Sequence, residues 1–299
     1  LNPALPQSAL DEAMRQIIRL ESPDMLSDNM AFHKMLTRGI QLDVRHDDGS
    51  VRGETVWLVD FDTPDNNDWL VVNQLTIIGP TQKNRRPDVI LYINGFPLVL
   101  IELKDFTNPS AKVKRAWQQI QTYKDDIPQL FVTNAVLVAS DGVITRMGSL
   151  TAGWERFGHW REIDGQTPPP KTMTSLEVLT RGLLEKRCLL DYIRHFILFE
   201  NHDGIIKKIA AYHQYYAVNT SVAQTVAALK PIGNGKAGVV WHTQGSGKSI
   251  SMVFYAAKLI THPTAKNPTL VLITDRNDLD GQLFTQFSRS AQLLNSTPI

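Results

Sequence analysis

Two acidic residues and a lysine interrupt the segment RPDVILYINGFPLVLIELKD, residues 86–105, which otherwise resembles two apolar strands. The acids are Asp88 and Glu102, and the amine belongs to Lys104. An ionised side chain on a buried strand is costly unless it is paired or binds a metal. Two carboxylates suit Mg²⁺, which lowers the pKa of a bound water, and an amine can orient that water or stabilise charge at phosphorus. The pattern predicts metal-dependent phosphodiester hydrolysis.

The turn between the two strands decides whether these side chains meet. A two-residue loop at positions 94–95 would pair Asp88 with Ile101 and direct the carboxylate away from Glu102. A three-residue loop at 94–96 would pair Asp88 with Glu102 instead. We therefore predict an odd register at this turn, or a compensating bulge.

Strand alternation assigns the neighbouring side chains to two faces. Residues two apart point the same way, so Leu98 and Leu100 are expected on the face of Glu102 and Lys104. Val99, Ile101 and Leu103 are expected on the opposite face. Apolar residues on both faces indicate a central strand.

A helix is predicted after the hairpin, in NPSAKVKRAWQQIQTYKDDIP, where Asn108 or Ser110 would form the N-cap. Gln119 and Tyr123 are four residues apart and share one helical face. An ordinary amphipathic helix also has a polar face, so the residues alone do not assign a function. Basic residues before the first acid, Lys83, Arg85 and Arg86, could contact phosphates, although such runs are more often surface charge.

A second chemical pattern is HTQGSGKS, residues 242–249, between an apolar run and an apolar helix pattern. Such a loop presents backbone N–H groups to phosphates, which glycines allow to approach closely. Lys248 would neutralise the phosphates, and the Ser249 hydroxyl would bind Mg²⁺. The loop residues expected to contact a nucleotide are Thr243, Gly245, Ser246, Gly247, Lys248 and Ser249.

The elements around these residues suggest two α/β parts. Apolar and β-branched runs separated by turn residues, followed by a helix and a buried strand, predict a mixed sheet flanked by helices over residues 1–165. Three consecutive prolines mark 166–185 as a linker and connecting helix. The pattern of residues 186–299 indicates helices followed by two strand-loop-helix units, which predicts parallel α/β construction.

Composition sets further bounds. The chain has 31 Lys and Arg against 30 Asp and Glu, so any DNA affinity must arise from local patches. A single cysteine argues against a disulfide framework and favours a reducing compartment. No segment resembles a membrane span or signal peptide, so we expect a cytoplasmic protein without a membrane partner. The absence of an initiator Met suggests a piece of a longer protein.

The spacing of Pro87-Asp88, 13 intervening residues and Glu102-Leu103-Lys104 is similar to the PD-(D/E)xK nuclease pattern. This resemblance implies that the Leu103 carbonyl joins both carboxylates around the metal. In the RecB-like branch, a Gln-x-x-x-Tyr element follows and helps hold DNA, which matches Gln119 and Tyr123.

The phosphate loop resembles motif I of superfamily 2 helicases, with His242 where the strict pattern has glycine. In AYHQYYAV, Gln214 resembles the glutamine that contacts adenine, and VLITDRNDLDGQ resembles motif Ia, with Asp275, Arg276 and Gln282. These likenesses imply part of a RecA-like lobe that binds ATP. The acidic hydrolytic motif does not follow the loop in this sequence, so an incomplete ATPase is expected.

The order of these motifs resembles the restriction (HsdR) subunit of type I restriction-modification enzymes. The resemblance implies an ATP-dependent translocase that uses Mg²⁺ to cut unmodified double-stranded DNA away from the recognition site. Its partners would be methylation and specificity subunits. Two alternatives remain: a helicase-nuclease of DNA repair, and a non-catalytic nucleotide-gated DNA-binding module whose acids and lysine form a structural ion pair.

Overall fold

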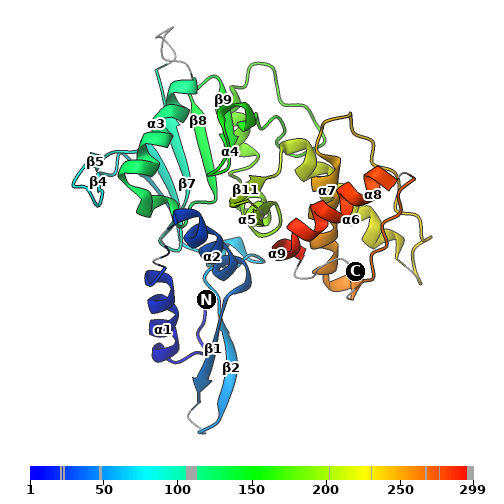
Figure 1. Ribbon diagram of the computed structural model, residues 1–299, viewed down its shortest axis with the longest axis horizontal. Coiled ribbons are helices and arrows are strands. Elements are labelled where there is room, and N and C mark those ends of the chain that lie inside the picture. The colour runs from blue at the N-terminus through cyan, green and yellow to red at the C-terminus, as the bar shows by residue number, and fades with distance from the viewer. Residues whose placement is uncertain are drawn as a thin grey trace.

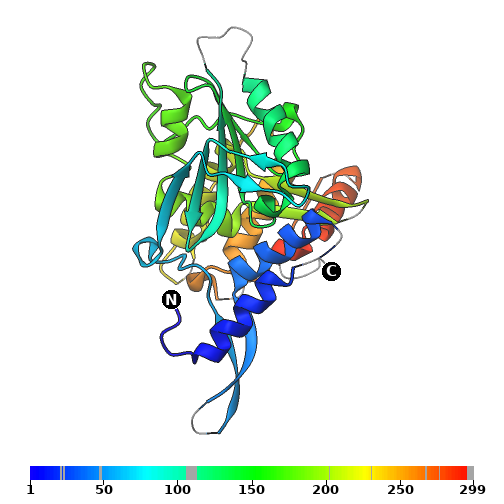
Figure 2. The same ribbon diagram turned by 90° about the vertical axis from the view of Figure 1, so that its left-hand side faces the viewer.

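The structure is a computed structural model that describes residues 1–294 except 21, 23, 47–48, 106–112, 202, 230, 267 and 276. It begins with helices α1 (Gln7–Ile18) and α2 (Met25–Arg38) and a hairpin of β1 (Ile40–Arg45) and β2 (Val51–Val56). Helix α2 starts where the Asp24 side chain accepts hydrogen bonds from the N–H groups of Leu26 and Ser27. Figures 1 and 2 show α1 and the hairpin extending away from the main body.

A five-stranded mixed sheet forms the centre of the N-terminal half, as predicted. In spatial order its strands are β3 (Trp69–Asn73), β6 (Val89–Ile93), β7 (Phe96–Leu103), β8 (Val136–Ser140) and β9 (Thr145–Gly148). Strands β7 and β8 are parallel, and the other neighbours are antiparallel. Parallel neighbours need a crossover, which helix α3 (Val113–Asp126) supplies.

Helices cover both faces of this sheet, which explains why every residue of β8 is buried. On one face, Ile120 of α3 belongs to an apolar cluster with Leu100 and Leu137. On the other face, Val99 belongs to a second cluster with Phe32 of α2. The helical cap expected at Asn108 or Ser110 lies outside the described residues.

The turn between β6 and β7 contains only Asn94 and Gly95, so the expected three-residue loop is wrong. Both have left-handed backbones, with φ of 50° and 82°, as a hairpin turn that follows the strand twist requires. The register then shifts, because Tyr92 pairs with Pro97 whereas Leu91 pairs with Val99. One residue of β7 is therefore extra, and the alternative prediction of a compensating bulge is confirmed.

The extra residue is Leu98, and it corrects one expected face assignment. We expected Leu98 on the face of Leu100, but Leu98 packs in the same cluster as Val99, while Leu100 packs against α3. A bulge places two consecutive side chains on one side of the sheet and then restores alternation. Beyond the bulge, Leu100 and Glu102 share the α3 face, as predicted.

Several short elements lie between the main helices and strands. A two-stranded ribbon of β4 (Ile77–Ile78) and β5 (Asn84–Arg85) lies between β3 and β6 in sequence. The single-turn helices are η1 (Pro64–Asn66), η2 (Pro128–Phe131), η3 (Trp154–Arg156) and η4 (Pro263–Ala265). Prolines 168–170 lie outside helices and strands, and α4 (Ser175–Arg181) follows with Thr174 as its N-cap.

The C-terminal half contains mainly helices. They are α5 (Lys186–His195), α6 (Tyr212–Ala228), α7 (Lys248–Ile260), α8 (Asn277–Arg289) and α9 (Ala291–Leu294), with an antiparallel pair of β10 (Ile197–Asn201) and β11 (Ile205–Ile209) after α5. No helix in the described part of the chain is long and apolar enough to cross a membrane.

The strands expected before α7 and α8 are absent from residues 237–241 and 268–274. Both segments are exposed, as the 95% exposure of Val239 and the 89% exposure of Ile273 show. A strand needs a hydrogen-bonded neighbour, and none of the described residues forms a ladder with either segment. The prediction of parallel strands here was therefore wrong for this structure.

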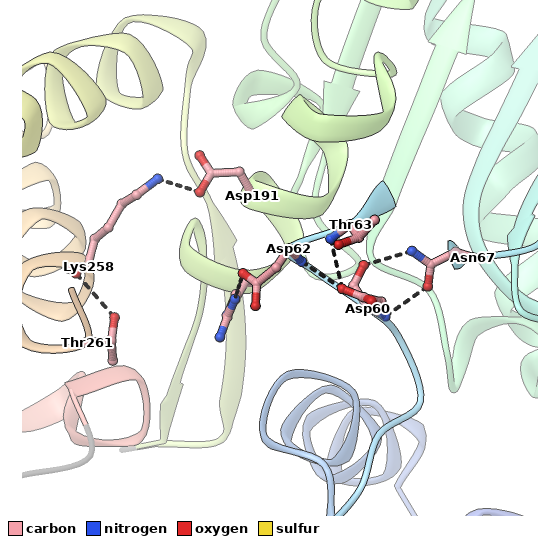
Figure 3. A network of polar contacts seen from close by, with 8 residues as sticks. Asp60, Asp62, Thr63, Asn67, Asp191, Lys258 and Thr261 are labelled. Atoms are coloured by element: carbon pink, nitrogen blue, oxygen red, sulfur yellow. Dashed lines mark hydrogen bonds and ion pairs between the residues drawn. The ribbon is translucent and has the colours of Figure 1, made fainter. Parts of the chain in front are cut away.

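The two halves share one apolar cluster, which contains Val99 of β7, Phe199 of β10 and Phe254 of α7. Helix α5 also connects the halves through charged side chains. Its Arg194 pairs with Asp62 at 3.1 Å, and its Asp191 pairs with Lys258 of α7 (Figure 3). The division into parts at 165 and 186 stays a prediction, but packing continues across it.

Candidate functional site

The two predicted carboxylates lie together on the α3 face of the sheet. Val89 pairs with Ile101, so the next position along each strand places Asp88 opposite Glu102. The backbone N–H of Leu103 donates a hydrogen bond of 2.8 Å to Asp88 Oδ2. This bond connects the residue that precedes β6 to the end of β7 and fixes one oxygen of the half-buried Asp88 carboxylate.

Glu102 is buried with a charged partner. It is 2% exposed, and its Oε1 lies 2.6 Å from Lys104 Nζ, whose side chain is 26% exposed. Its Oε2 is also buried and accepts no hydrogen bond from the described residues. Burial raises the pKa of the Glu102 carboxyl, and the nearby Asp88 raises this pKa further, while Lys104 and the Tyr123 hydroxyl oppose the change.

Tyr123, on helix α3, lies beside the Glu102–Lys104 pair. It is buried, and its hydroxyl contacts the Arg86 carbonyl at a long 3.5 Å. Burial and the negative charge of Glu102 raise the pKa of Tyr123, so the phenol stays protonated. Gln119 is half-buried one turn earlier on α3, and its side chain makes no hydrogen bond within the described residues.

Sequence reasoning missed Gln74, which contacts Asp88 from the end of β3. Its Nε2 donates a 2.5 Å hydrogen bond to Asp88 Oδ1, and its backbone N–H donates a 3.0 Å bond to the Asp88 carbonyl. The pairing of Asn73 with Val89 places these residues side by side. Only that register could have revealed the contact, because no local pattern marks Gln74.

Two of the basic residues considered for phosphate contact have another partner in the structure. Lys83 Nζ lies 2.8 Å and Arg85 Nη2 2.5 Å from the carboxylate of Asp126, at the end of α3. These cations lower the pKa of the buried Asp126 carboxyl. The pairs therefore join β5 to α3 and hold the helix that carries Tyr123.

The donor set fits a hard cation with few protein ligands. No group of three or more His, Cys, Asp or Glu residues in the described part of the chain is arranged to bind a metal. Asp88 and Glu102 supply two carboxylates, and the unpartnered Glu102 Oε2 is an orphaned buried acceptor that a cation would satisfy. Mg²⁺ is commonly held by one or two carboxylates, with water completing the shell.

The phosphate loop runs into the N-terminus of α7. Gly247 caps the helix with φ of 78°, and a Cβ there would lie 2.7 Å from Gln214 Nε2. Gln214 is buried, accepts a 2.9 Å hydrogen bond from the Ala211 N–H, and donates one of 3.1 Å to the Gly247 carbonyl. Gln214 therefore holds the end of the phosphate loop through the Gly247 carbonyl. Its predicted contact with adenine stays a prediction.

The other residues of the phosphate loop make contacts within the loop or lie at the start of α7. Lys248 is exposed and its Nζ donates to the Thr243 carbonyl at 3.1 Å, while Ser246 Oγ donates to the same carbonyl at 2.8 Å. Gly245 has a left-handed backbone with φ of 80°, and the half-buried Ser249 lies in the first turn of α7. Arg276, expected in the downstream motif, lies outside the described residues.

Comparison with known proteins identifies the family. Residues 1–156, slightly more than half of the chain, match the family described as type I restriction enzyme R protein N terminus. The chain belongs to this type I restriction enzyme R protein family. Residues 213–297 match a second family, described as SWI2/SNF2 ATPase. The first match contains Asp88, Glu102 and Lys104, and the second contains the phosphate loop.

Curated relatives support the same assignment. The chain is 46% identical over 303 residues to the type I restriction enzyme HindI endonuclease subunit of Haemophilus influenzae, covering 100% of this chain and 28% of the relative. It is 32% identical over 309 residues to the putative MjaIXP endonuclease subunit of Methanocaldococcus jannaschii, covering 96% and 29%. A Staphylococcus aureus endonuclease subunit, SauMSSORF170P, is 28% identical over 84% of this chain and 25% of its own length. The chain thus spans less than a third of these relatives.

Proposed function

We propose that residues 1–165 form a PD-(D/E)xK nuclease domain that hydrolyses DNA phosphodiesters with Mg²⁺. The observation that carries this proposal is the meeting of Asp88 and Glu102 on one face, with Lys104 beside them. The bulge at Leu98 makes that meeting possible in spite of a two-residue turn. Such a device at a candidate site fits the tendency of bulges to redirect side chains next to active sites.

Each residue has a distinct role in this proposal. Asp88, Glu102 and the Leu103 carbonyl would hold the cation. Bound there, Mg²⁺ would lower the pKa of a water for attack on phosphorus. Lys104 would stabilise the negative charge of the transition state, and its 2.6 Å contact with Glu102 keeps its amine at the site. Gln119 and Tyr123 would position DNA from α3.

We further propose that residues 186–299 bind ATP through the phosphate loop, with Mg²⁺ coordinated by Ser249. Glycines at 245 and 247, Lys248 and the N-terminus of α7 provide the chemistry for phosphate binding. The match to the SWI2/SNF2 ATPase family supports this role. The complete protein would be an ATP-dependent, DNA-translocating endonuclease subunit of a cytoplasmic type I restriction enzyme, assembled with methylation and specificity subunits.

A cleavage assay on the full-length protein with its companion subunits tests the nuclease site. Asp88→Ala and Lys104→Ala should each reduce double-strand cleavage by at least about a hundredfold while ATP hydrolysis continues. Asp125→Ala is a matched control, because Asp125 is an exposed acid on α3. Normal cleavage by a folded Asp88→Ala variant would refute the proposed site.

The non-catalytic alternative rests on one specific observation, the ion pair between Glu102 and Lys104. If this pair is only structural, exchanging the two residues, Glu102→Lys with Lys104→Glu, should preserve whatever the protein does. The nuclease proposal requires cleavage to be lost in the exchanged variant, because the metal would lose an acidic ligand.

A further inference from the structure

The contact between Gln74 and Asp88 carries an inference about metal binding that rests on the proposed nuclease function. Gln74 makes the last hydrogen bond between β3 and β6 with its backbone N–H, and it grips Asp88 Oδ1 with its side chain. Leu103 already donates to Asp88 Oδ2. The Gln74 side chain and the Leu103 backbone N–H therefore each hold one oxygen of the Asp88 carboxylate. Together they fix the orientation of the carboxylate plane.

Gln74, which makes this contact, also has an unusual backbone conformation. Its φ is 55°, in the left-handed region that glycine favours and that a residue with a Cβ enters only at a cost. The side chain is exposed, so burial does not explain why glutamine is present. Strained residues of this kind concentrate where the surrounding structure uses them for function.

We propose that Gln74 is a positioning residue that holds the Asp88 carboxylate in the orientation required for metal binding. A carboxylate that rotates freely loses orientational freedom when it binds a cation, whereas a carboxylate already fixed by hydrogen bonds does not. Each oxygen keeps a lone pair for the cation, since a carboxylate oxygen can accept more than one partner. Loss of a hydrogen-bond partner of a metal ligand commonly lowers metal affinity or activity by about 10- to 100-fold.

Gln82 provides a matched control within the same chain. It is also an exposed glutamine with a left-handed backbone, at φ of 60°, but it lies in the turn between β4 and β5 and makes no side-chain hydrogen bond within the described residues. Gln74→Gly and Gln82→Gly remove the same atoms and relieve the same kind of backbone strain. Neither substitution should lower the melting temperature.

Calorimetric titration of Mn²⁺ into each variant measures the proposed effect without relying on cleavage. For Gln74→Gly the dissociation constant should rise about 10- to 100-fold, and for Gln82→Gly it should not change. Cleavage by the full-length Gln74→Gly protein should recover at correspondingly higher metal concentrations. Unaltered Mn²⁺ affinity in Gln74→Gly would overturn the inference.

Asp88→Ala separates this inference from the proposed function. If Asp88→Ala retains both metal binding and cleavage, the nuclease site itself is wrong. If Asp88→Ala loses both whereas Gln74→Gly behaves like the unchanged chain, the site stands and only the positioning role of Gln74 fails.

Discussion

Asp88 and Glu102 face each other across the β6–β7 pair because Leu98 of β7 bulges and has no partner residue in β6. Without the bulge, a regular ladder that continued from the two-residue turn would pair Leu91 with Leu98 and therefore Asp88 with Ile101, on the opposite face from Glu102. The same bulge buries Leu98 and Val99 in one cluster. Packing on one side of the sheet and the candidate chemistry on the other therefore depend on a single residue.

Glu102→Gln should stabilise the metal-free protein while abolishing cleavage. Burial raises the pKa of Glu102, so its folded carboxyl binds a proton more tightly than the unfolded one. Stability from this group is present below the unfolded pKa and is lost as pH rises through the folded pKa. A neutral amide avoids that loss, and we expect about 1–2 kcal/mol of added stability at pH 8.

Denaturant unfolding of both proteins at pH 4 and pH 8, with a metal chelator present, checks this expectation. The difference between them should shrink at the lower pH, where Glu102 is protonated. A Glu102→Gln protein that is less stable than the unchanged chain at pH 8 would contradict it.

Tyr123→Phe should move metal binding to higher pH. The Tyr123 hydroxyl lowers the pKa of Glu102, so its removal raises that pKa further. Because a metal needs the ionised carboxylate, the pH midpoint of Mn²⁺ binding should increase. Titrations across a pH series measure the midpoint, and Tyr92→Phe, which alters a tyrosine of β6 outside this contact, serves as the control. An unchanged midpoint would exclude the hydroxyl from the site.

Gly247→Ala should lower the affinity for nucleotide more than Gly245→Ala does. Both glycines have left-handed backbones, with φ of 78° and 80°, so alanine strains each by about 1 kcal/mol. Only at Gly247 would the new Cβ also lie 2.7 Å from Gln214 Nε2, which is too close. The Gln214 side chain would have to move and would lose its hydrogen bond to the loop. Fluorescence titration with a labelled ATP analogue compares the two variants; equal losses would show that Gln214 does not matter.

Lys207→Met should flatten the dependence of stability on pH in the alkaline range. Lys207 is fully buried, its Nζ donates to Asn29 Oδ1 at 3.0 Å, and burial lowers its pKa from 10.5 to about 7. Between pH 7 and pH 10.5, Lys207 is protonated in the unfolded chain and largely deprotonated in the folded protein. Stability should therefore rise with pH, by up to about 1.4 kcal/mol per pH unit, from about pH 7 towards pH 10.

Unfolding free energies of the unchanged chain, Lys207→Met and Lys208→Met over this pH range provide the comparison. Lys208 is the adjacent residue, is partly exposed and pairs with Glu200 at 2.6 Å, so its replacement removes a lysine without removing the buried one. Lys208→Met should keep the alkaline rise. A rise that persists in Lys207→Met would show that Lys207 is not its source.

Local sequence patterns predicted where some residues of the candidate site lie, while their function stays a prediction. Glu102 lies on β7 and Lys104 directly follows the strand, two residues later, and their predicted meeting on one face agrees with their contact at 2.6 Å. The two-residue turn predicted that a bulge is needed, but it did not predict that the bulge lies at Leu98. That position depends on the packing of both Leu98 and Val99 in one apolar cluster. Gln74 was missed because its contact depends on pairing between β3 and β6.

Other errors had different physical causes. The apolar runs at 237–241 and 268–274 have the composition of strands, but composition cannot supply a hydrogen-bonded neighbour. Lys207 was overlooked because lysine is seldom buried. Only the structure reveals that the Asn29 side-chain oxygen accepts a hydrogen bond from the Lys207 amine. In each case the decisive partner is distant in sequence.

The apolar cluster shared by β7, β10 and α7 limits how the sheet could be exchanged between proteins. A recombination event that joined residues 1–165 to an unrelated second part would remove Phe199, whose ring lies 5.4 Å from that of His33. A working chimera would have to inherit the segment from α4 to α6 together with the sheet. The unit of modular inheritance in this family is therefore expected to be larger than the part that holds Asp88 and Glu102.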